Sequence, residues 1–121
     1  MLSNKKAMLK NLLIVEDNPS MRRLIKSVCK DLAAEIHECV DGADALAAYE
    51  AHCPEWILMD VEMQEKDGFT ATREIMQIHP EAKILILTRY ETARMREEAK
   101  KAGAREYVIK ENLLTIRQIL H

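Results

Sequence analysis

The sequence predicts an α/β domain in which five βα units form one parallel sheet, covered by helices on both faces. Two observations predict this fold. Short apolar runs recur along the chain, and stretches with helical spacing of apolar residues lie between them. Strands and helices that alternate in this way build parallel sheets through right-handed crossovers. With 121 residues, the chain is expected to form a single domain.

Five short apolar runs are the predicted strands. They are rich in Ile, Leu and Val and show no polar alternation, which is typical of strands buried on both faces of a sheet. Three of the runs are continuous and lie at residues 12–15, 56–59 and 84–87. Two weaker runs lie at residues 36–40 and 107–109.

Five stretches between and after these runs are the predicted helices. The first, at residues 21–32, places apolar residues at i, i+3, i+4, i+7 and i+11. The others lie at residues 43–51, 69–79, 92–102 and 113–120. Pro54 and Pro80 follow the second and third, and Gly103 closes the fourth, as expected just past a helix end.

The composition is that of an ordinary globular protein. Hydrophobic residues make up 48% and charged residues 31%, and the net charge of −2 gives no reason to expect nucleic acid. No apolar run approaches the roughly 20 residues that span a bilayer. Residues 1–10 have no signal-peptide pattern and are expected to be a flexible tail before a domain at 11–121.

Neither the cysteines nor the histidines form a recognisable site. The three cysteines contain no CxxC pair, which favours reduced thiols and a cytoplasmic location. The four histidines have no i, i+4 partner among themselves or the cysteines, so no metal site is expected from them.

Polar side chains follow four of the five predicted strands. Glu16 and Asp17 follow the first, Asp60 the third, Thr88 the fourth and Lys110 the fifth. In open α/β sheets, ligands bind outside the carboxyl ends of the strands. Each residue alone has an ordinary explanation as a turn, a cap or a solvated edge. Together they predict one site.

This set suits transfer of a phosphoryl group to a carboxylate. Mg²⁺ prefers oxygen ligands, which Glu16 and Asp17 could supply directly or through water. Asp60 would be the nucleophile and form an acyl phosphate. Lys110 would neutralise one phosphoryl oxygen, and Thr88 would donate a hydrogen bond to another.

At these residues the chain resembles the response regulator receiver family of two-component signalling. The likeness covers residues 12–120, and five motifs carry it: VEDN (15–18), LMDVEMQEKDGF (58–69), ILILT (84–88), GA (103–104) and YVIK (107–110). The resemblance implies a single-domain flavodoxin-like (βα)5 fold with strand order 2-1-3-4-5.

The resemblance also implies residue roles. Asp60 corresponds to the phospho-acceptor. Glu16, Asp17 and Asp60, with the backbone carbonyl of Glu62, correspond to the protein ligands of Mg²⁺. Such a domain catalyses only its own phosphorylation and dephosphorylation, so it is not expected to be an enzyme in the usual sense.

Signal output and partners follow from the same resemblance. Thr88 and Tyr107 correspond to a switch pair that reshapes the face formed by the fourth helix, the fifth strand and the fifth helix. The phosphodonor would be a histidine kinase or phosphotransfer protein. A downstream protein or a fused output domain would read the face, without direct contact to nucleic acid or membrane. A dimer linked to phosphorylation is a further option.

Three residues depart from the family pattern. Gln64 stands where the family usually has Pro, which is expected to loosen the loop after Asp60. Arg89 stands where a small residue is usual, and we expect it to modulate the site by shielding it. Glu111 replaces a Pro that commonly forms a cis bond, so a trans bond is expected after Lys110. This last departure also occurs in receivers of transcription factors, so the chain could be cut from a longer regulator.

Three other functions are compatible with a fold of this kind. A pseudo-receiver, which binds proteins without phosphorylation, stays open because of Arg89 and Glu111. A haloacid dehalogenase-like phosphatase ranks low, because its DxD motif follows the first strand and the chain has no room for a cap. Flavin binding is discarded, because Glu16 and Asp17 stand where a phosphate-cradling loop is needed.

Overall fold

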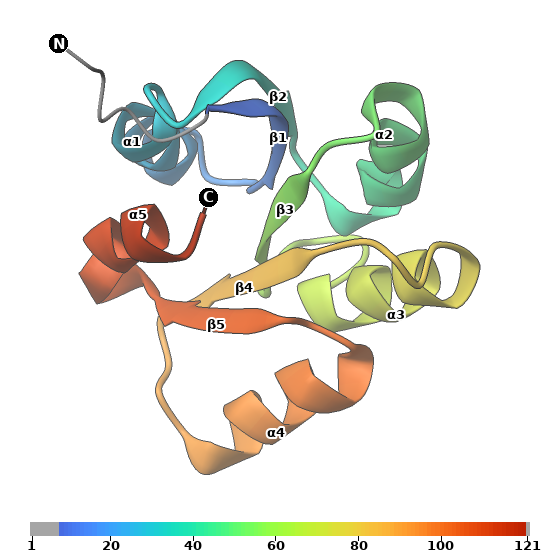
Figure 1. Cartoon of the computed structure of the whole chain (residues 1–121). Helices are drawn as coiled ribbons and strands as arrows, with labels where there is room; N and C mark the ends of the chain where they lie inside the picture. Colours follow the sequence, from blue (N-terminus) through green and yellow to red (C-terminus); the bar gives the residue numbers. More distant parts are fainter. Residues whose placement is uncertain (1–7, 121) are drawn as a thin grey trace, which may run out of the picture.

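The computed structural model describes residues 8–120 and confirms the predicted fold. Five parallel strands form one sheet in the order β2-β1-β3-β4-β5 (Figure 1). This is the flavodoxin-like order that the resemblance to the receiver family implies. The strands are β1 (Leu9–Val15), β2 (Ala33–Cys39), β3 (Trp56–Asp60), β4 (Ile84–Thr88) and β5 (Glu106–Ile109).

Helices cover both faces of the sheet (Figure 1). One face carries α1 (Pro19–Cys29) and α5 (Ile116–Ile119), and a 3₁₀ turn, η2 (Lys110–Thr115), leads into α5. The other face carries α2 (Ala45–His52), α3 (Gly68–Ile78) and α4 (Ala93–Ala102), with a second 3₁₀ turn, η1 (Gly42–Asp44), before α2. Within residues 8–120, none of these helices has the length and apolar character to cross a membrane.

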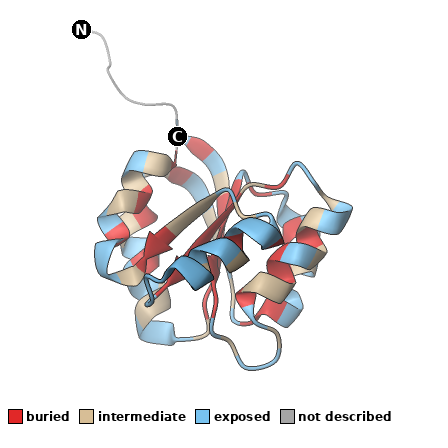
Figure 2. Ribbon diagram, turned by 90° about the horizontal axis from the view of Figure 1, so that it is seen from below, coloured by how far each residue is buried: buried red, intermediate tan, exposed pale blue. Residues whose placement is uncertain are grey.

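The alternation of side chains along the central strands divides the core into two halves. On β1, Leu12 and Ile14 pack toward α1 and α5, whereas Leu13 and Val15 pack toward α2, α3 and α4. Every residue of β3 and β4 is buried, as the red central ribbons of Figure 2 show. The continuous apolar runs therefore reflect a sheet that is covered on both faces.

Local signals in the sequence set the helix boundaries. Asn18 caps α1 by accepting from the N–H of Met21, and Pro19 takes the first helical position. Thr92 caps α4 in the same way, so the predicted helix at 92–102 begins one residue later. Gly103 ends α4 with φ of 103°, a left-handed conformation that favours glycine.

The two ends of the domain differ from the sequence prediction. β1 begins at Leu9, inside the predicted tail, because Leu9 is buried and pairs with Ala33 of β2. The rest of that tail, residues 1–7, lies outside the described residues. At the other end, residues 113–115 of the predicted fifth helix belong to the 3₁₀ turn η2, and only Ile116–Ile119 are α-helical. Asn112, earlier in the same turn, has non-helical angles (φ −120°, ψ 49°).

A buried carboxylate joins the corner after β2 to the loop after β3. Asp41 is 8% exposed, and its carboxylate accepts from the backbone N–H groups of Ala43 (2.8 Å), Glu65 (3.0 Å) and Lys66 (3.1 Å). The backbones also meet closely, because a Cβ on Gly42 would come within 2.3 Å of the Lys66 carbonyl oxygen. Asp41 therefore restrains the loop that follows Asp60.

Replacing Asp41 with Ala is expected to lower the free energy of unfolding by about 1–3 kcal/mol, since buried N–H groups lose their acceptor. Burial disfavours the charge, but these backbone N–H groups outweigh burial and lower the pKa of Asp41. This stabilisation is therefore present above the ordinary pKa of 3.8 and is lost as the pH falls through the lower folded value. Urea unfolding across acidic pH measures it, and the exposed neighbour Asp44, changed to Asn, is the control. Equal losses for both variants would contradict this role.

Candidate functional site

The register of the sheet brings the predicted site residues to one edge. Val15 of β1 pairs with Met59 of β3, so the residues that follow them, Glu16 and Asp60, lie side by side. On the next pairs of strands, Asp60 lies opposite Leu87. Thr88 lies opposite Ile109, directly before Lys110. The four strand ends therefore meet at one rim, as the sequence predicts.

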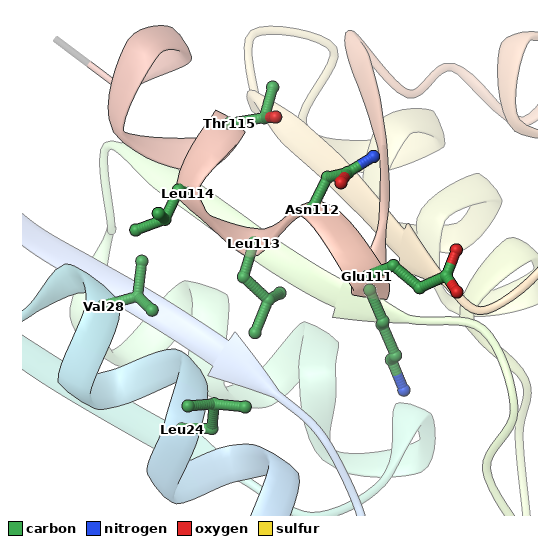
Figure 3. Close-up of a pocket in the computed structure, with 8 residues that line it drawn as sticks. Leu24, Val28, Glu111, Asn112, Leu113, Leu114 and Thr115 are labelled. Atoms are coloured by element: carbon green, nitrogen blue, oxygen red, sulfur yellow. The ribbon is translucent and has the colours of Figure 1, made fainter.

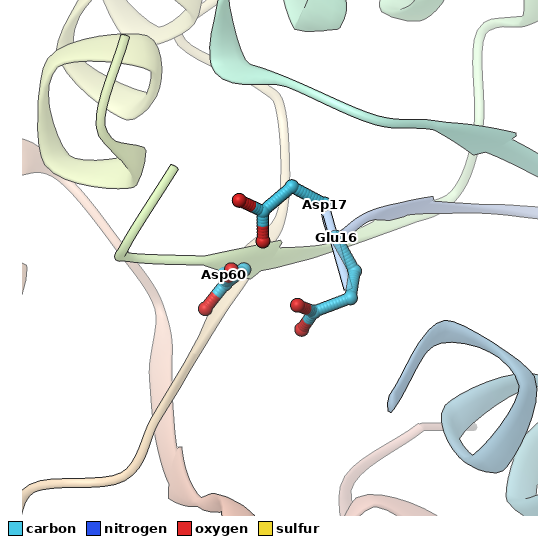
Figure 4. A group of neighbouring side chains, drawn as sticks. All are labelled: Glu16, Asp17 and Asp60. Atoms are coloured by element: carbon cyan, nitrogen blue, oxygen red, sulfur yellow. The ribbon is translucent and has the colours of Figure 1, made fainter. Parts of the chain in front are cut away.

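Three carboxylates form the centre of the site. One oxygen from each of Glu16, Asp17 and Asp60 lies within 4.8 Å of the others, and Figure 4 shows them converging from β3 and the loop after β1. Glu16 and Asp60 are 1% and 2% exposed, whereas Asp17 is half-buried. Two carboxyl groups are thus buried in the pocket, and a third lies at its mouth.

Lys110 supplies the positive charge within this pocket. Its Nζ donates a hydrogen bond of 2.8 Å to Asp60 Oδ1 and lies 3.0 Å from Glu16 Oε1, and the side chain is 8% exposed. The bond between Lys110 and Glu111 is trans, as expected. Burial opposes the charge, but the hydrogen bond to Asp60 and the charges of Asp60 and Glu16 raise the pKa of Lys110. The ammonium therefore stays protonated.

The surroundings of Glu16 disfavour the ionised form of its carboxyl group. Burial, with a contribution from the charge of Asp60, raises the pKa of Glu16 to about 7, although Lys110 opposes the shift. The buried Oε1 of Glu16 lies 3.0 Å from Lys110 Nζ, in an ion pair. Three carboxylates beside one ammonium leave the pocket with excess negative charge, and their oxygen atoms are a donor set that suits Mg²⁺.

Thr88 and Tyr107 are connected through the loop after β4. The Thr88 side chain is buried, and its hydroxyl oxygen accepts from the N–H of Tyr90 (3.2 Å). The hydroxyl of Tyr107 donates to the carbonyl oxygen of Tyr90, and the Arg96 guanidinium lies 4.7 Å from the centre of its ring. Both predicted switch residues thus contact the same backbone segment. Burial raises the pKa of Tyr107, against the charge of Arg96.

Two further predicted residues lie on loops around the pocket. Glu62 and Arg89 are exposed. Glu62 comes two residues after Asp60, the end of β3, and Arg89 directly follows Thr88, the end of β4. No side-chain bond ties either residue to the carboxylates. Their predicted roles, as a backbone ligand and as a shield, stay predictions.

A groove of about 480 Å³ runs from the site along α1 and η2. Figure 3 shows Leu24 and Val28 of α1 facing Leu113 and Leu114 across it. Leu24 and Leu114 are 49% and 69% exposed, and Lys110 lines one end of the groove. The groove therefore reaches Lys110, whose ammonium contacts Asp60.

Comparison with known proteins identifies the family. Residues 12–120 match the model of the response regulator receiver domain. The chain belongs to this family. The chemotaxis protein CheY of Bacillus subtilis is 36% identical over 100 residues, which cover 82% of this chain and 83% of that protein. CheY of Thermotoga maritima is 36% identical over 102 residues, covering 84% and 85%.

Solved structures agree with the family assignment. The chemotaxis protein CheY4 of Vibrio cholerae superposes with a TM-score of 0.81 at 26% identity, covering 95% of this receiver domain and all of that chain (100%). Receiver domains of two-component response regulators bind Mg²⁺ at an acidic pocket, and Glu16, Asp17 and Asp60 form such a pocket here. The predicted family and fold are thereby confirmed.

Several residues outside the predicted set also support the site. Arg22 of α1 donates to the backbone carbonyl of Glu16 (2.8 Å), and Tyr90 links Thr88 to Tyr107. Asn18, the cap of α1, also donates its N–H to Glu16 Oε2 (3.2 Å). Of these three residues, only Asn18 has a local signal, because Asn before Pro at a helix start indicates a cap.

Proposed function

We propose that this receiver domain accepts a phosphoryl group on Asp60 from a histidine kinase or a phosphotransfer protein, with Mg²⁺ bound beside it, in the cytoplasm. One observation carries the proposal: Lys110 Nζ lies within 3.0 Å of carboxylate oxygens of both Asp60 and Glu16, and the carboxylate of Asp17 lies beside them at the mouth of the same pocket. A structural ion pair needs one carboxylate, whereas phosphoryl transfer needs a nucleophile, a cation site and a compensating ammonium.

In the transfer step, a carboxylate oxygen of Asp60 attacks the phosphorus of a phosphohistidine. The P–N bond breaks, the imidazole nitrogen keeps the electron pair and takes up a proton from water, and an acyl phosphate remains on Asp60. Lys110 is placed to move its ammonium from Asp60 to an oxygen of the new phosphoryl group. Thr88, on the neighbouring strand, offers its hydroxyl to another oxygen.

The carboxylates of Glu16, Asp17 and Asp60, with the backbone carbonyl of Glu62, would hold Mg²⁺. Mg²⁺ supplies charge neutralisation for the phosphoryl oxygens when it is bound. The convergence of three carboxylates beside a single ammonium supports this assignment. The domain would catalyse its own phosphorylation and dephosphorylation and nothing further.

Output would pass through Thr88 and Tyr107 to the α4-β5-α5 face. Movement of the Thr88 hydroxyl toward a phosphoryl group would withdraw it from the N–H of Tyr90, whose carbonyl oxygen holds the Tyr107 hydroxyl. A downstream protein or a fused output domain would read the change, or a second copy in a dimer. The donor would contact the groove of Leu24 and Leu114, which ends at Lys110.

Mass spectrometry tests the proposal directly. We expect wild-type protein incubated with a small acyl phosphate and Mg²⁺ to gain one phosphoryl group, and Asp60→Asn to gain none. Omitting Mg²⁺ should prevent the gain in the wild type. A wild-type protein that is never phosphorylated, by acyl phosphate or by a kinase, would instead be a pseudo-receiver that binds partners without this chemistry.

Arg89→Ala is expected to shorten the lifetime of the phosphorylated state several-fold. Arg89 is exposed and directly follows Thr88, so its long side chain can cover the phosphoryl group and limit the approach of water. The phosphorylated fraction is followed over time after donor removal. Arg94→Ala, on α4, is the matched control and should decay like the wild type. A lifetime in Arg89→Ala equal to or longer than that of the wild type would refute the shielding role.

A further inference from the structure

A guanidinium on α1 connects the acidic pocket to the edge of the sheet. Arg22 Nη1 donates to the backbone carbonyl of Glu16 (2.8 Å), and Arg22 Nε donates to Glu38 Oε1 on β2 (3.0 Å). The side chain of Arg22 is 19% exposed, and Glu38 is also held by Lys26 Nζ (2.9 Å). Arg22 is thus fixed at both ends of its planar group.

The hydrogen bond from Arg22 to the Glu16 carbonyl lies just beyond the end of β1, where sheet hydrogen bonds no longer hold the backbone. β1 ends at Val15, and the N–H of Glu16 makes a last sheet-like bond to the carbonyl oxygen of Cys39 (3.1 Å). The carbonyl of Glu16 lies beyond this bond, and Arg22 is its donor. Asn18 fixes the side chain of Glu16 through Oε2 (3.2 Å). Arg22 therefore restrains the peptide between Glu16 and Asp17, from which both carboxylates project.

We propose that Arg22 is a positioning residue for the acidic pocket, and that Glu38 anchors it. Arg22 touches no carboxylate oxygen of the pocket, so it acts through the backbone of Glu16. It holds Glu16 in register with Asp60 and Lys110, and it sets the direction in which Asp17 leaves the strand. This inference rests on the proposed function, because it assigns Arg22 a part in binding the divalent cation.

The sign of the effect separates positioning from simple charge. Removing a nearby positive charge would by itself make the acidic pocket bind Mg²⁺ more tightly. Loss of a group that orients metal ligands has the opposite effect and typically weakens metal binding by about 10- to 100-fold. We therefore expect Arg22→Gln to weaken Mg²⁺ binding about 10-fold.

Two further variants sharpen the test. Arg22→Lys keeps the charge, but one ammonium cannot reproduce the planar fork that serves Glu16 and Glu38 together, so weaker Mg²⁺ binding is expected here as well. Arg23→Gln makes the same charge change one residue along α1, where the exposed side chain contacts only Ser20 among the described residues (3.4 Å). This control should bind Mg²⁺ as well as the wild type or slightly better.

The anchoring role of Glu38 is tested by a double-mutant cycle. Glu38→Ala should weaken Mg²⁺ binding several-fold in the wild-type background and leave it unchanged in the Arg22→Gln background. An effect of the Glu38 charge alone would persist in both backgrounds. Isothermal titration calorimetry with Mg²⁺ measures all four proteins at a temperature where circular dichroism shows each of them folded.

The outcomes distinguish this inference from the proposed function. Wild-type protein that does not bind Mg²⁺ would overturn the proposed function. Wild-type protein that binds Mg²⁺, while Arg22→Gln binds it equally or more tightly, would overturn the positioning role alone. Weaker binding in Arg22→Gln and Arg22→Lys, with Arg23→Gln unchanged, supports it.

Discussion

Lys110→Met is expected to slow phosphorylation of the domain about 10²- to 10³-fold while tightening its binding of Mg²⁺. The ammonium of Lys110 is the cation that bonds Asp60 (2.8 Å) and neighbours Glu16 (3.0 Å) inside the pocket. Without it, the three carboxylates attract a divalent cation more strongly. The incoming phosphoryl group, however, loses the positive charge that should stabilise its oxygens during transfer.

The same substitution should also destabilise the fold. Lys110 is 8% exposed and Glu16 only 1%, so the variant leaves buried carboxylates without a cation. Removing one partner of a buried pair typically costs about 3–5 kcal/mol. The loss should shrink when Mg²⁺ is added, because the ion takes over the charge compensation, and it should shrink at low pH, where the carboxylates are neutralised.

Three measurements check this expectation against one control. Acyl-phosphate labelling gives the phosphorylation rate, calorimetry gives the affinity for Mg²⁺, and urea unfolding gives the stability. Lys101→Met removes an equal charge from an exposed position on α4 and should leave all three unchanged. Labelling of Lys110→Met at a near wild-type rate, or weaker Mg²⁺ binding, would mean that Lys110 serves only as a structural ion pair.

The core of this site was predictable because it depends on strand ends. Parallel strands place their carboxyl ends on one rim, so residues after the apolar runs had to meet there. Glu16 lies beside Asp60 because Val15 of β1 pairs with Met59 of β3, one residue before each of them. Departures such as Glu111 did not disturb the arrangement, since the trans bond still directs Lys110 to Asp60.

The supporting contacts were not predictable, because they join residues far apart in the chain. Glu38 lies on the edge strand, sixteen residues after Arg22, and only the folded sheet brings the two together. Asp41 reaches Glu65 and Lys66 in a similar way. In the sequence, Arg22 lies among the polar residues of a predicted helix, and Asp41 lies in the short turn between a predicted strand and a predicted helix. Tertiary hydrogen bonds of this kind leave no periodicity in the sequence.

The predicted fifth helix shows a different limit. Leu113, Ile116 and Ile119 have helical spacing, and Leu113 and Ile116 do pack against the core. The backbone nevertheless follows a 3₁₀ turn as far as Thr115, with Asn112 out of helical conformation. Apolar spacing reports which residues face the core and not which type of turn carries them there.

Stabilisation of the domain by Mg²⁺ is expected to increase as the pH rises through about 7, and Glu16 is the reason. Burial and the charge of Asp60 raise the pKa of Glu16 from 4.5 to about 7. The folded state therefore binds this proton more tightly than the unfolded chain does. Without Mg²⁺, the contribution of Glu16 is present below pH 4.5 and is lost as the pH rises toward 7.

Mg²⁺ should reverse this decrease, because it binds the ionised carboxylate and displaces the proton. At pH 8 the ion meets a pocket that is already ionised, whereas at pH 5.5 it must first remove the proton from Glu16. The rise in melting temperature on adding Mg²⁺ should therefore be several degrees larger at pH 8, as differential scanning calorimetry would show.

Glu16→Gln isolates the group responsible, since the amide keeps the shape of the side chain and cannot titrate. The variant should lose the decrease in stability between pH 4.5 and 7 in the absence of Mg²⁺, and its remaining response to Mg²⁺ should be nearly the same at both pH values. Glu97→Gln, exposed on α4, serves as the control and should keep the wild-type profile. A Mg²⁺ response in the wild type that does not change from pH 5.5 to 8 would show that Glu16 is already ionised in the empty pocket.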